Sequence, residues 1–132
     1  MTSLTLRAQG PASEDVVWER YVDPGQWSTW APQIQRVSAS TQRLVAGTTG
    51  TVHAGLLPRP TLSVAFEVLT LDEARHEWTW RAHVGPIGLR LEHGVRSRGD
   101  GTETWLRVHG PLPIVLAYAP VARLALSRLV RE

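Results

Sequence analysis

The sequence predicts an α+β fold in which a curved antiparallel β-sheet wraps around a C-terminal helix. From about residue 34 to residue 110, apolar and polar residues alternate with a period of two, which is typical of half-buried strands. Helical spacing of apolar residues precedes this region and returns after it. The predicted order of elements is therefore β-α-α-β-β-β-β-β-β-α, in a single domain covering residues 1–132.

The N-terminal part of the chain is expected to form one strand and two helices. Thr2–Ala8 alternates as a strand does, and Pro11–Asp15 then supplies a first-turn proline, a capping serine and two acids. The first helix should end near Val22, before Asp23-Pro24-Gly25, and a second short helix or turn should cover Gly25–Trp30. The expected apolar side of the first helix consists of Val16, Val17, Trp18 and Tyr21.

Six further strands are expected, joined by short links rich in Gly, Pro or Asp. Tight links of this kind between alternating strands indicate an antiparallel meander. The strands are Ile34–Ser40, Gly47–Ala54, Thr61–Asp72, Arg75–Val84, Ile87–Arg98 and Thr102–Gly110. Their later links are Leu57–Pro60, Asp72–Ala74, Gly85–Pro86 and Gly99–Gly101.

The chain ends in a pattern of helical spacing that begins after Pro111. Pro120 lies inside this pattern and predicts a kink, or a division into a short and a longer helix. The expected apolar stripe consists of Ile114, Tyr118, Val121, Ala122, Ala125 and Leu129. We expect no membrane span here, because Arg123, Arg128 and two prolines interrupt the apolar run.

Composition excludes several classes of function. The chain has 132 residues, no Cys and a formal net charge of +2, with basic residues that are all Arg and widely scattered. The lack of Cys excludes disulfides, thiolate zinc sites and cysteine nucleophiles, and scattered arginines argue against nucleic-acid binding. The five His have no metal-ligand spacing, so we expect neither a metal site nor a cofactor. With no visible signal peptide, we expect a cytoplasmic location.

The run from Trp18 to Ile34, with Asp23-Pro24 and the pair Trp27 and Trp30, resembles the N-terminal signature of the START-like, Bet v 1-like (SRPBCC) superfamily. The resemblance is to its polyketide cyclase/dehydrase and lipid-transport branch. Further similarities are Glu77–Trp80, His93, Gly99–Thr104 and the Gly110-Pro-Leu before the last helix. The resemblance implies a helix-grip fold with an internal cavity that holds a hydrophobic small molecule.

Strand alternation assigns side chains to the inner face of the sheet. Trp78 and Trp80 share one face of their strand, and Leu89, Leu91 and His93 share one face of the next. The inner face is thus apolar and aromatic with one polar side chain, as in a site for an apolar ligand. The predicted ligand-binding residues are Trp27, Trp30, Phe66, Trp78, Trp80, Leu89, Leu91 and Tyr118, and Leu62 and Val64 are expected in the same wall. The pattern does not determine the facing of His53, Arg36 and Arg107.

Two functions fit these residues. The first is a non-catalytic carrier of a lipid, polyketide or isoprenoid. The alternative is a polyketide cyclase or dehydratase with His93 as acid or base, since an imidazole can exchange protons near pH 7. Each site residue also has a structural interpretation, as core packing for the tryptophans and as a hydrogen-bonded core residue for His93. A regulatory partner-binding domain is a third possibility, and the oligomeric state is left open between monomer and homodimer.

Overall fold

The described part of the chain forms a sheet of seven antiparallel strands, as the alternation predicts. The computed structural model describes residues 2–55 and 62–131, and its strand order is β1-β7-β6-β5-β4-β3-β2. The strands are β1 (Thr2–Gly10), β2 (Ile34–Ala39), β3 (Thr49–Ala54), β4 (Leu62–Asp72), β5 (Glu77–Val84), β6 (Ile87–Arg98) and β7 (Gly101–Gly110). The predicted link Leu57–Pro60 and the predicted strand start at Thr61 lie outside the described residues.

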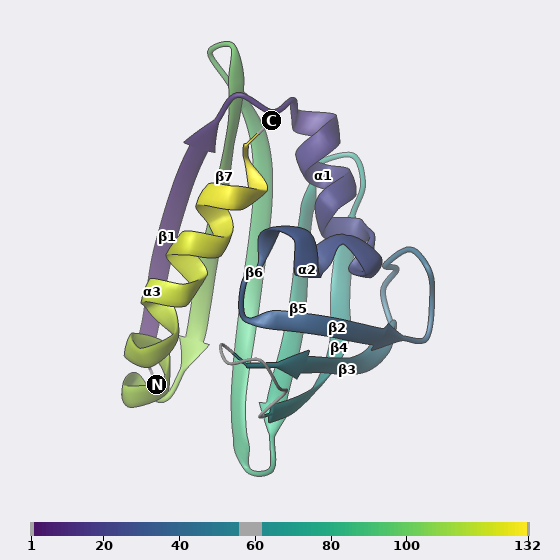
Figure 1. The fold of residues 1–132 in the computed structure, drawn as a ribbon, viewed down its shortest axis with the longest axis vertical. Helices are drawn as coiled ribbons and strands as arrows, with labels where there is room; N and C mark the ends of the chain where they lie inside the picture. Colours follow the sequence, from purple (N-terminus) through teal and green to yellow (C-terminus); the bar gives the residue numbers. More distant parts are fainter. Residues whose placement is uncertain (1, 56–61, 132) are drawn as a thin grey trace.

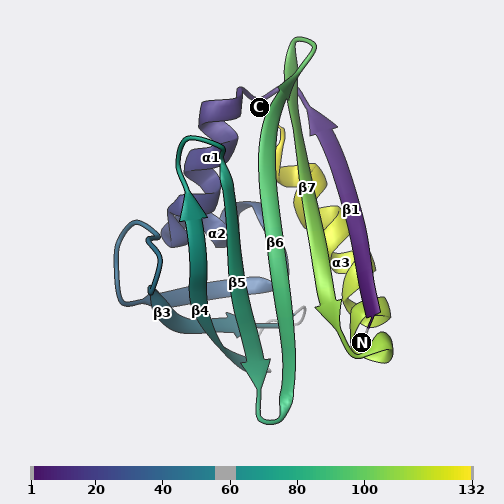
Figure 2. The same cartoon turned by 180° about the vertical axis from the view of Figure 1, so that it is seen from behind.

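The sheet is strongly curved and its helices lie on one face of it. Figure 1 shows β2 and β3 running across the direction of the long strands, with the helices in front of the sheet. Figure 2 shows the opposite face, along which β4 to β7 and β1 run side by side. The helices are α1 (Glu14–Val22), the 3₁₀ turn η1 (Pro24–Gln26), α2 (Trp27–Trp30) and α3 (Leu112–Leu129). The predicted helix-grip architecture is therefore confirmed.

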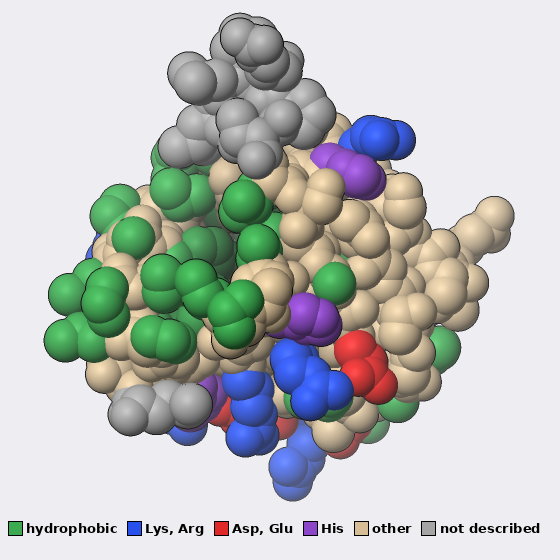
Figure 3. Space-filling view, turned by 90° about the horizontal axis from the view of Figure 1, so that it is seen from below, with side chains coloured by type: hydrophobic (Ala, Val, Ile, Leu, Met, Phe, Trp, Pro, Cys, Tyr) green, Lys and Arg blue, Asp and Glu red, His purple; other side chains and the backbone are tan. Residues whose placement is uncertain are grey.

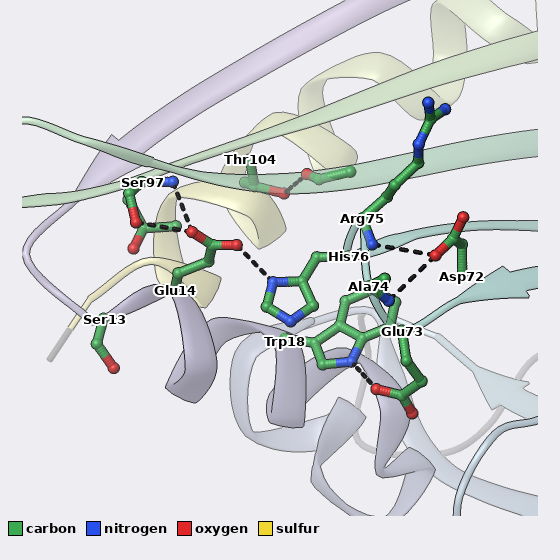
Figure 4. Close-up of polar contacts among 12 residues, drawn as sticks. Ser13, Glu14, Trp18, Asp72, Glu73, Ala74, Arg75, His76, Ser97 and Thr104 are labelled. Carbon is green, nitrogen blue, oxygen red and sulfur yellow. Dashed lines mark hydrogen bonds and ion pairs between the residues drawn. The ribbon is translucent and has the colours of Figure 1, made fainter.

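Local contacts fix α1 against the sheet. The hydroxyl of Ser13 accepts from the backbone N–H of Val16 (3.3 Å) and so caps the first turn. The Glu14 carboxylate accepts from both the backbone N–H (2.9 Å) and the hydroxyl (2.7 Å) of Ser97 on β6, and pairs with Nδ1 of His76 at 2.5 Å. Figure 4 shows these contacts beside the indole of Trp18, which stacks on the His76 ring at 4.9 Å. They determine where α1, and hence the following η1 and α2, lie on the sheet.

Two expectations at α1 and β5 are wrong. Val16 is 45% exposed, because Val17, Trp18, Tyr21 and Val22 form the buried face of α1 instead. Strand β5 begins at Glu77 rather than Arg75, because His76 has a φ of 55° and so cannot continue an extended strand. His76 instead lies in the turn before β5, where its ring contacts Glu14 and Trp18 of α1.

Helix α3 is one continuous helix of 18 residues, so Pro120 does not divide it. Its buried residues are Val115, Ala122, Ala125, Leu126 and Leu129. Of the predicted stripe, Ala122, Ala125 and Leu129 are thus buried, and Ile114, Tyr118 and Val121 are partly buried. Leu112 and Leu116, in the first half of the helix, are 50% and 57% exposed. By length and composition alone α3 would suit a membrane span, with a mean hydropathy of 1.4, and core helices of soluble proteins meet the same test.

Candidate functional site

A small aromatic pocket lies between the inner face of the sheet, α2 and α3. Its volume is about 40 Å³. Its lining consists of Trp27, Trp30, Ala31, Gln33, Ile34, Trp78, Trp80, His93, Leu106, Tyr118, Ala122, Ala125 and Leu126. Seen from below the view of Figure 1, hydrophobic side chains gather around a hollow at the end of the molecule where α3 begins (Figure 3). The pocket is therefore bordered by the same elements that the sequence predicts around a cavity.

The structure brings together most, but not all, of the predicted site residues. Six of them line the pocket: Trp27, Trp30, Trp78, Trp80, His93 and Tyr118. Phe66, Leu89 and Leu91 are not in its lining. Phe66 and Leu91 are 3% and 1% exposed and belong to the core beside the pocket. Of the other two residues expected in the wall, Leu62 is 48% exposed, at the start of β4, and Val64 is partly buried against the core.

Several lining residues are not among the predicted site residues. Leu106 lies on β7, directly opposite His93 in the register of β6 and β7, so strand alternation could have identified it. Gln33 precedes β2 in a segment without a period, and no sequence signal marks it. Ala122 and Ala125 belong to the predicted apolar stripe of α3, but small side chains give no sign that they border a pocket.

His93 is the polar centre of the pocket wall. Its Nδ1 lies 3.2 Å from the hydroxyl of Tyr21, which lies 2.6 Å from Oγ1 of Thr104. The Thr104 hydroxyl in turn donates to the carbonyl of Gly94 at 3.0 Å. Burial lowers the pKa of His93 to about 3, because a charged imidazolium loses its hydration in the core. The imidazole is therefore neutral at physiological pH.

The tryptophans form a nearly continuous aromatic layer beside His93. The ring of His93 stacks on that of Trp78, with 4.7 Å between the ring centroids, and the ring of Trp78 stacks on that of Trp80, with 5.5 Å between centroids. From the helical side, the ring of Trp27 contacts both indoles, with its centroid 5.9 Å from that of Trp78 and 5.5 Å from that of Trp80. The indole N–H of Trp27 donates to the backbone carbonyl of Tyr21 at 2.8 Å, which fixes its ring at the end of α1. These rings occupy much of the space between sheet and helices.

The three side chains of undetermined facing do not enter the pocket. Arg36 and Arg107 are exposed, and Arg107 donates to the hydroxyl of Thr5 at 3.3 Å. Val52 is buried, so the next residue, His53, points to the opposite face of β3. The lining of the pocket, within the described residues, thus contains no arginine and no acid.

The pocket is much smaller than the cavity that the sequence led us to expect. A volume of about 40 Å³ admits roughly three water molecules. Pockets that hold drug-sized molecules are typically about 300–1,000 Å³. A ligand larger than a few waters therefore requires side chains or α3 to move.

Other parts of the described chain offer weaker candidates. An open groove of about 560 Å³ between α1, η1 and β2 is lined by exposed polar residues such as Gln42 and Arg43, and contains none of the predicted site residues. Within residues 2–55 and 62–131, no group of three or more His, Asp or Glu side chains could hold a metal ion. The aromatic pocket is accordingly the candidate site.

Comparison with known proteins agrees with this architecture. The family model described as polyketide cyclase/dehydrase and lipid transport matches residues 1–132. The comparison with curated proteins finds no match.

Among solved structures, the fold is similar to that of Ara h 8.0201, with a TM-score of 0.77, 14% identity, and coverage of 97% of this chain and 94% of that chain. It is similar to the di-domain ARO/CYC BexL from the BE-7585A biosynthetic pathway, with a TM-score of 0.80 and 16% identity over 98% of this chain but 45% of that chain. A protein from Nitrosospira multiformis has a TM-score of 0.78 and 13% identity over 98% of this chain and 94% of its own. These likenesses show the fold alone.

Proposed function

Because the chain belongs to the polyketide cyclase/dehydrase and lipid-transport family, we propose that it binds a small hydrophobic molecule between its sheet and α3. The observation that supports this most is the pocket whose wall includes stacked aromatic rings. Flat apolar rings offer a large contact area to a hydrophobic or aromatic ligand at little cost in conformational entropy.

Helix α3 is built in a way that would let the pocket enlarge. Of residues 112–121, all described, Val115 alone is buried. The second half is better anchored, because Ala125, Leu126 and Leu129 are buried and Arg20 donates to the Leu129 carbonyl at 2.7 Å. The weakly packed first half can therefore move while the second half stays in place.

Pro120 lies between these two halves. A proline has no backbone N–H, so the carbonyl of Leu116 lacks its ordinary helical donor at this position. A missing hydrogen bond at the junction lowers the cost of bending there. We propose that ligand binding displaces the first half of α3 about this point and enlarges the pocket beyond about 40 Å³.

A cyclase or dehydratase is the alternative. The family description includes such enzymes, but the imidazole of His93 is neutral at pH 7, so it has no imidazolium proton to donate as a general acid, and its pKa of about 3 makes it a weak base. No charged residue lines the pocket in the described part of the chain. Binding without chemistry is therefore the better supported proposal.

The proposal can be tested with an uncharged fluorescent probe, N-phenyl-1-naphthylamine. We expect saturable binding at one probe per chain, and a co-purified small molecule detectable by native mass spectrometry. Ala125 lines the pocket and is 3% exposed, so Ala125→Phe should fill the space and weaken probe binding at least about tenfold, as expected when a site is overpacked. Ala117 is exposed on the same helix, so Ala117→Phe is the matched control and should bind as the wild type does.

Equal probe affinity in the wild type and in Ala125→Phe would contradict the proposal. So would a wild-type chain that binds no probe and carries no small molecule. If Ala125→Phe does not fold, Ala122→Leu fills the same pocket with a smaller side chain and gives the same readout.

A further inference from the structure

Four buried side-chain nitrogen or oxygen atoms of the described residues have no hydrogen-bond partner, and all four belong to residues that line the pocket. They are Nε2 of His93, Nε1 of Trp78, Nε1 of Trp80 and Oε1 of Gln33. Folded proteins leave few buried polar atoms unpaired, because each costs about 1–3 kcal/mol. Their concentration around one pocket indicates that the missing partners belong to whatever occupies it.

The hydrogen-bond chain behind His93 determines the role of its free nitrogen. Thr104 has one hydroxyl proton, which it donates to the Gly94 carbonyl at 3.0 Å. The 2.6 Å bond between Tyr21 and Thr104 must then be donated by Tyr21. Tyr21 has no second proton, so Nδ1 of His93 donates to its oxygen at 3.2 Å. The neutral ring carries its proton on Nδ1, and Nε2 is a hydrogen-bond acceptor.

The two indoles supply the opposite polarity beside it. An indole nitrogen only donates, so Trp78 and Trp80 each offer one N–H. Trp78 lies directly opposite His93 in the register of β5 and β6, and the two rings stack at 4.7 Å. One unpaired acceptor and two unpaired donors therefore belong to residues of the sheet wall of the pocket.

We infer that the pocket takes an alcohol or phenol, whose O–H donates to Nε2 of His93 while its oxygen accepts from the indole N–H of Trp78 or Trp80. The inference rests on the proposed function and names the ligand's polar group. A carbonyl or ether accepts but does not donate, so it would leave Nε2 unpaired. A carboxylate would bring a charge into a pocket whose described lining has no cation to balance it.

The test uses three probes of similar shape: 2-naphthol, which donates and accepts; 2-methoxynaphthalene, which only accepts; and 2-methylnaphthalene, which does neither. Their dissociation constants follow from displacement of N-phenyl-1-naphthylamine. In the wild type we expect 2-naphthol to bind about tenfold more tightly than 2-methoxynaphthalene, since leaving a buried acceptor unpaired lowers affinity by roughly 5- to 150-fold. His93→Phe should reduce the preference to about twofold or less.

His83→Phe is the matched control: it makes the same substitution at a histidine that is exposed on β5 and lies outside the lining of the pocket, so it should preserve the preference. A second readout does not depend on a variant. In long-range ¹H–¹⁵N spectra of the wild type, 2-naphthol should shift the His93 Nε2 signal, and 2-methoxynaphthalene should not.

The failures of the two proposals are distinguishable. If all three probes bind with equal affinity, or if Nε2 does not respond to 2-naphthol, the inference is overturned while hydrophobic binding stands. If none of the three binds, both proposals fail. A preference that persists in His93→Phe also overturns the inference, because another group would then be the acceptor.

Discussion

Glu103 on β7 is the one acid that is buried among the described residues, and it lies on the outer face of the sheet rather than in the pocket. Its side chain is 3% exposed, and Arg98 donates to it at 2.8 Å. Arg96 donates to the same carboxylate, and Gln9 does so at 3.4 Å. Burial alone would raise the pKa of Glu103, but the hydrogen bond and charge of Arg96 and the other donors outweigh it and lower that pKa below its usual value.

Glu103→Gln should lower the free energy of unfolding at pH 7 by about 2 kcal/mol, because charge-assisted hydrogen bonds are lost. The pKa of Glu103 is lower in the folded chain than the 4.5 expected in the unfolded chain. The stabilisation by the Glu103 carboxylate is therefore present above pH 4.5, and it is lost as the pH falls through the folded-state pKa and the carboxylate is protonated. The difference between wild type and variant should therefore shrink from pH 7 to pH 3. Urea titrations across this range check it, with Glu77→Gln, an exposed residue on the same sheet, as control.

His93 predicts a second dependence on pH, with the protonated form disfavoured in the fold. The unfolded chain takes up a proton near the ordinary histidine pKa of 6.5, while the folded chain does so near pH 3. Stability should thus fall as pH drops below 6.5, by about 1.4 kcal/mol per unit, or about 2 kcal/mol at pH 5. His93→Phe should remove this dependence of the free energy of unfolding on pH, whatever the variant's stability at pH 7. Tyr118→Phe should keep the dependence. An unchanged slope in His93→Phe would show that other groups cause it.

At the residue scale, the sequence predicts which face of the sheet a side chain lies on, but not which residues of other strands it contacts. Strand alternation correctly assigned Trp78, Trp80 and His93 to the inner face, because the two-residue period of a strand can be recognised from neighbouring residues alone. The burial of Glu103 depends on arginines from two other strands, Arg7 on β1 and Arg96 and Arg98 on β6. No local pattern contains that arrangement.

At the scale of elements, the two helices that flank the sheet differ in how well their sequence specifies them. The start of α1 follows from a serine cap and two acids, and the structure has that cap at Ser13. The buried face of α3 could not be derived, because residues 112–119 are all apolar or proline and their period identifies no polar side. Tertiary packing, with Val115 rather than Ile114 against the sheet, decides the rotation of that half.

Pro120→Ala should strengthen α3, because it restores a backbone N–H at an exposed position inside the helix. We expect the free energy of unfolding to rise by about 1 kcal/mol, with slower amide hydrogen exchange in residues 114–121. Pro113 stands in the first turn, where no helical donor is needed. Pro113→Ala should therefore be neutral or slightly destabilising, since it only frees the unfolded chain. Equal effects of the two substitutions would contradict a hinge at Pro120.

At the scale of the whole molecule, the order of elements and the curvature of the sheet were predictable, and the size of the pocket was not. Order follows from periodicity and turns, each readable along the chain. Pocket volume is a small difference between the space that the sheet encloses and the side chains that fill it. Here Trp27, Trp78 and Trp80 reduce that difference to about 40 Å³.

Because the pocket is nearly full at rest, its closure should govern how fast a ligand enters. If the first half of α3 must swing out first, the observed association rate will rise with ligand concentration and then level off at the opening rate of the helix. Pro120→Ala should lower that plateau several-fold. Stopped-flow mixing with N-phenyl-1-naphthylamine measures it, and a rate that stays proportional to concentration would show that the pocket admits ligands without such a gate.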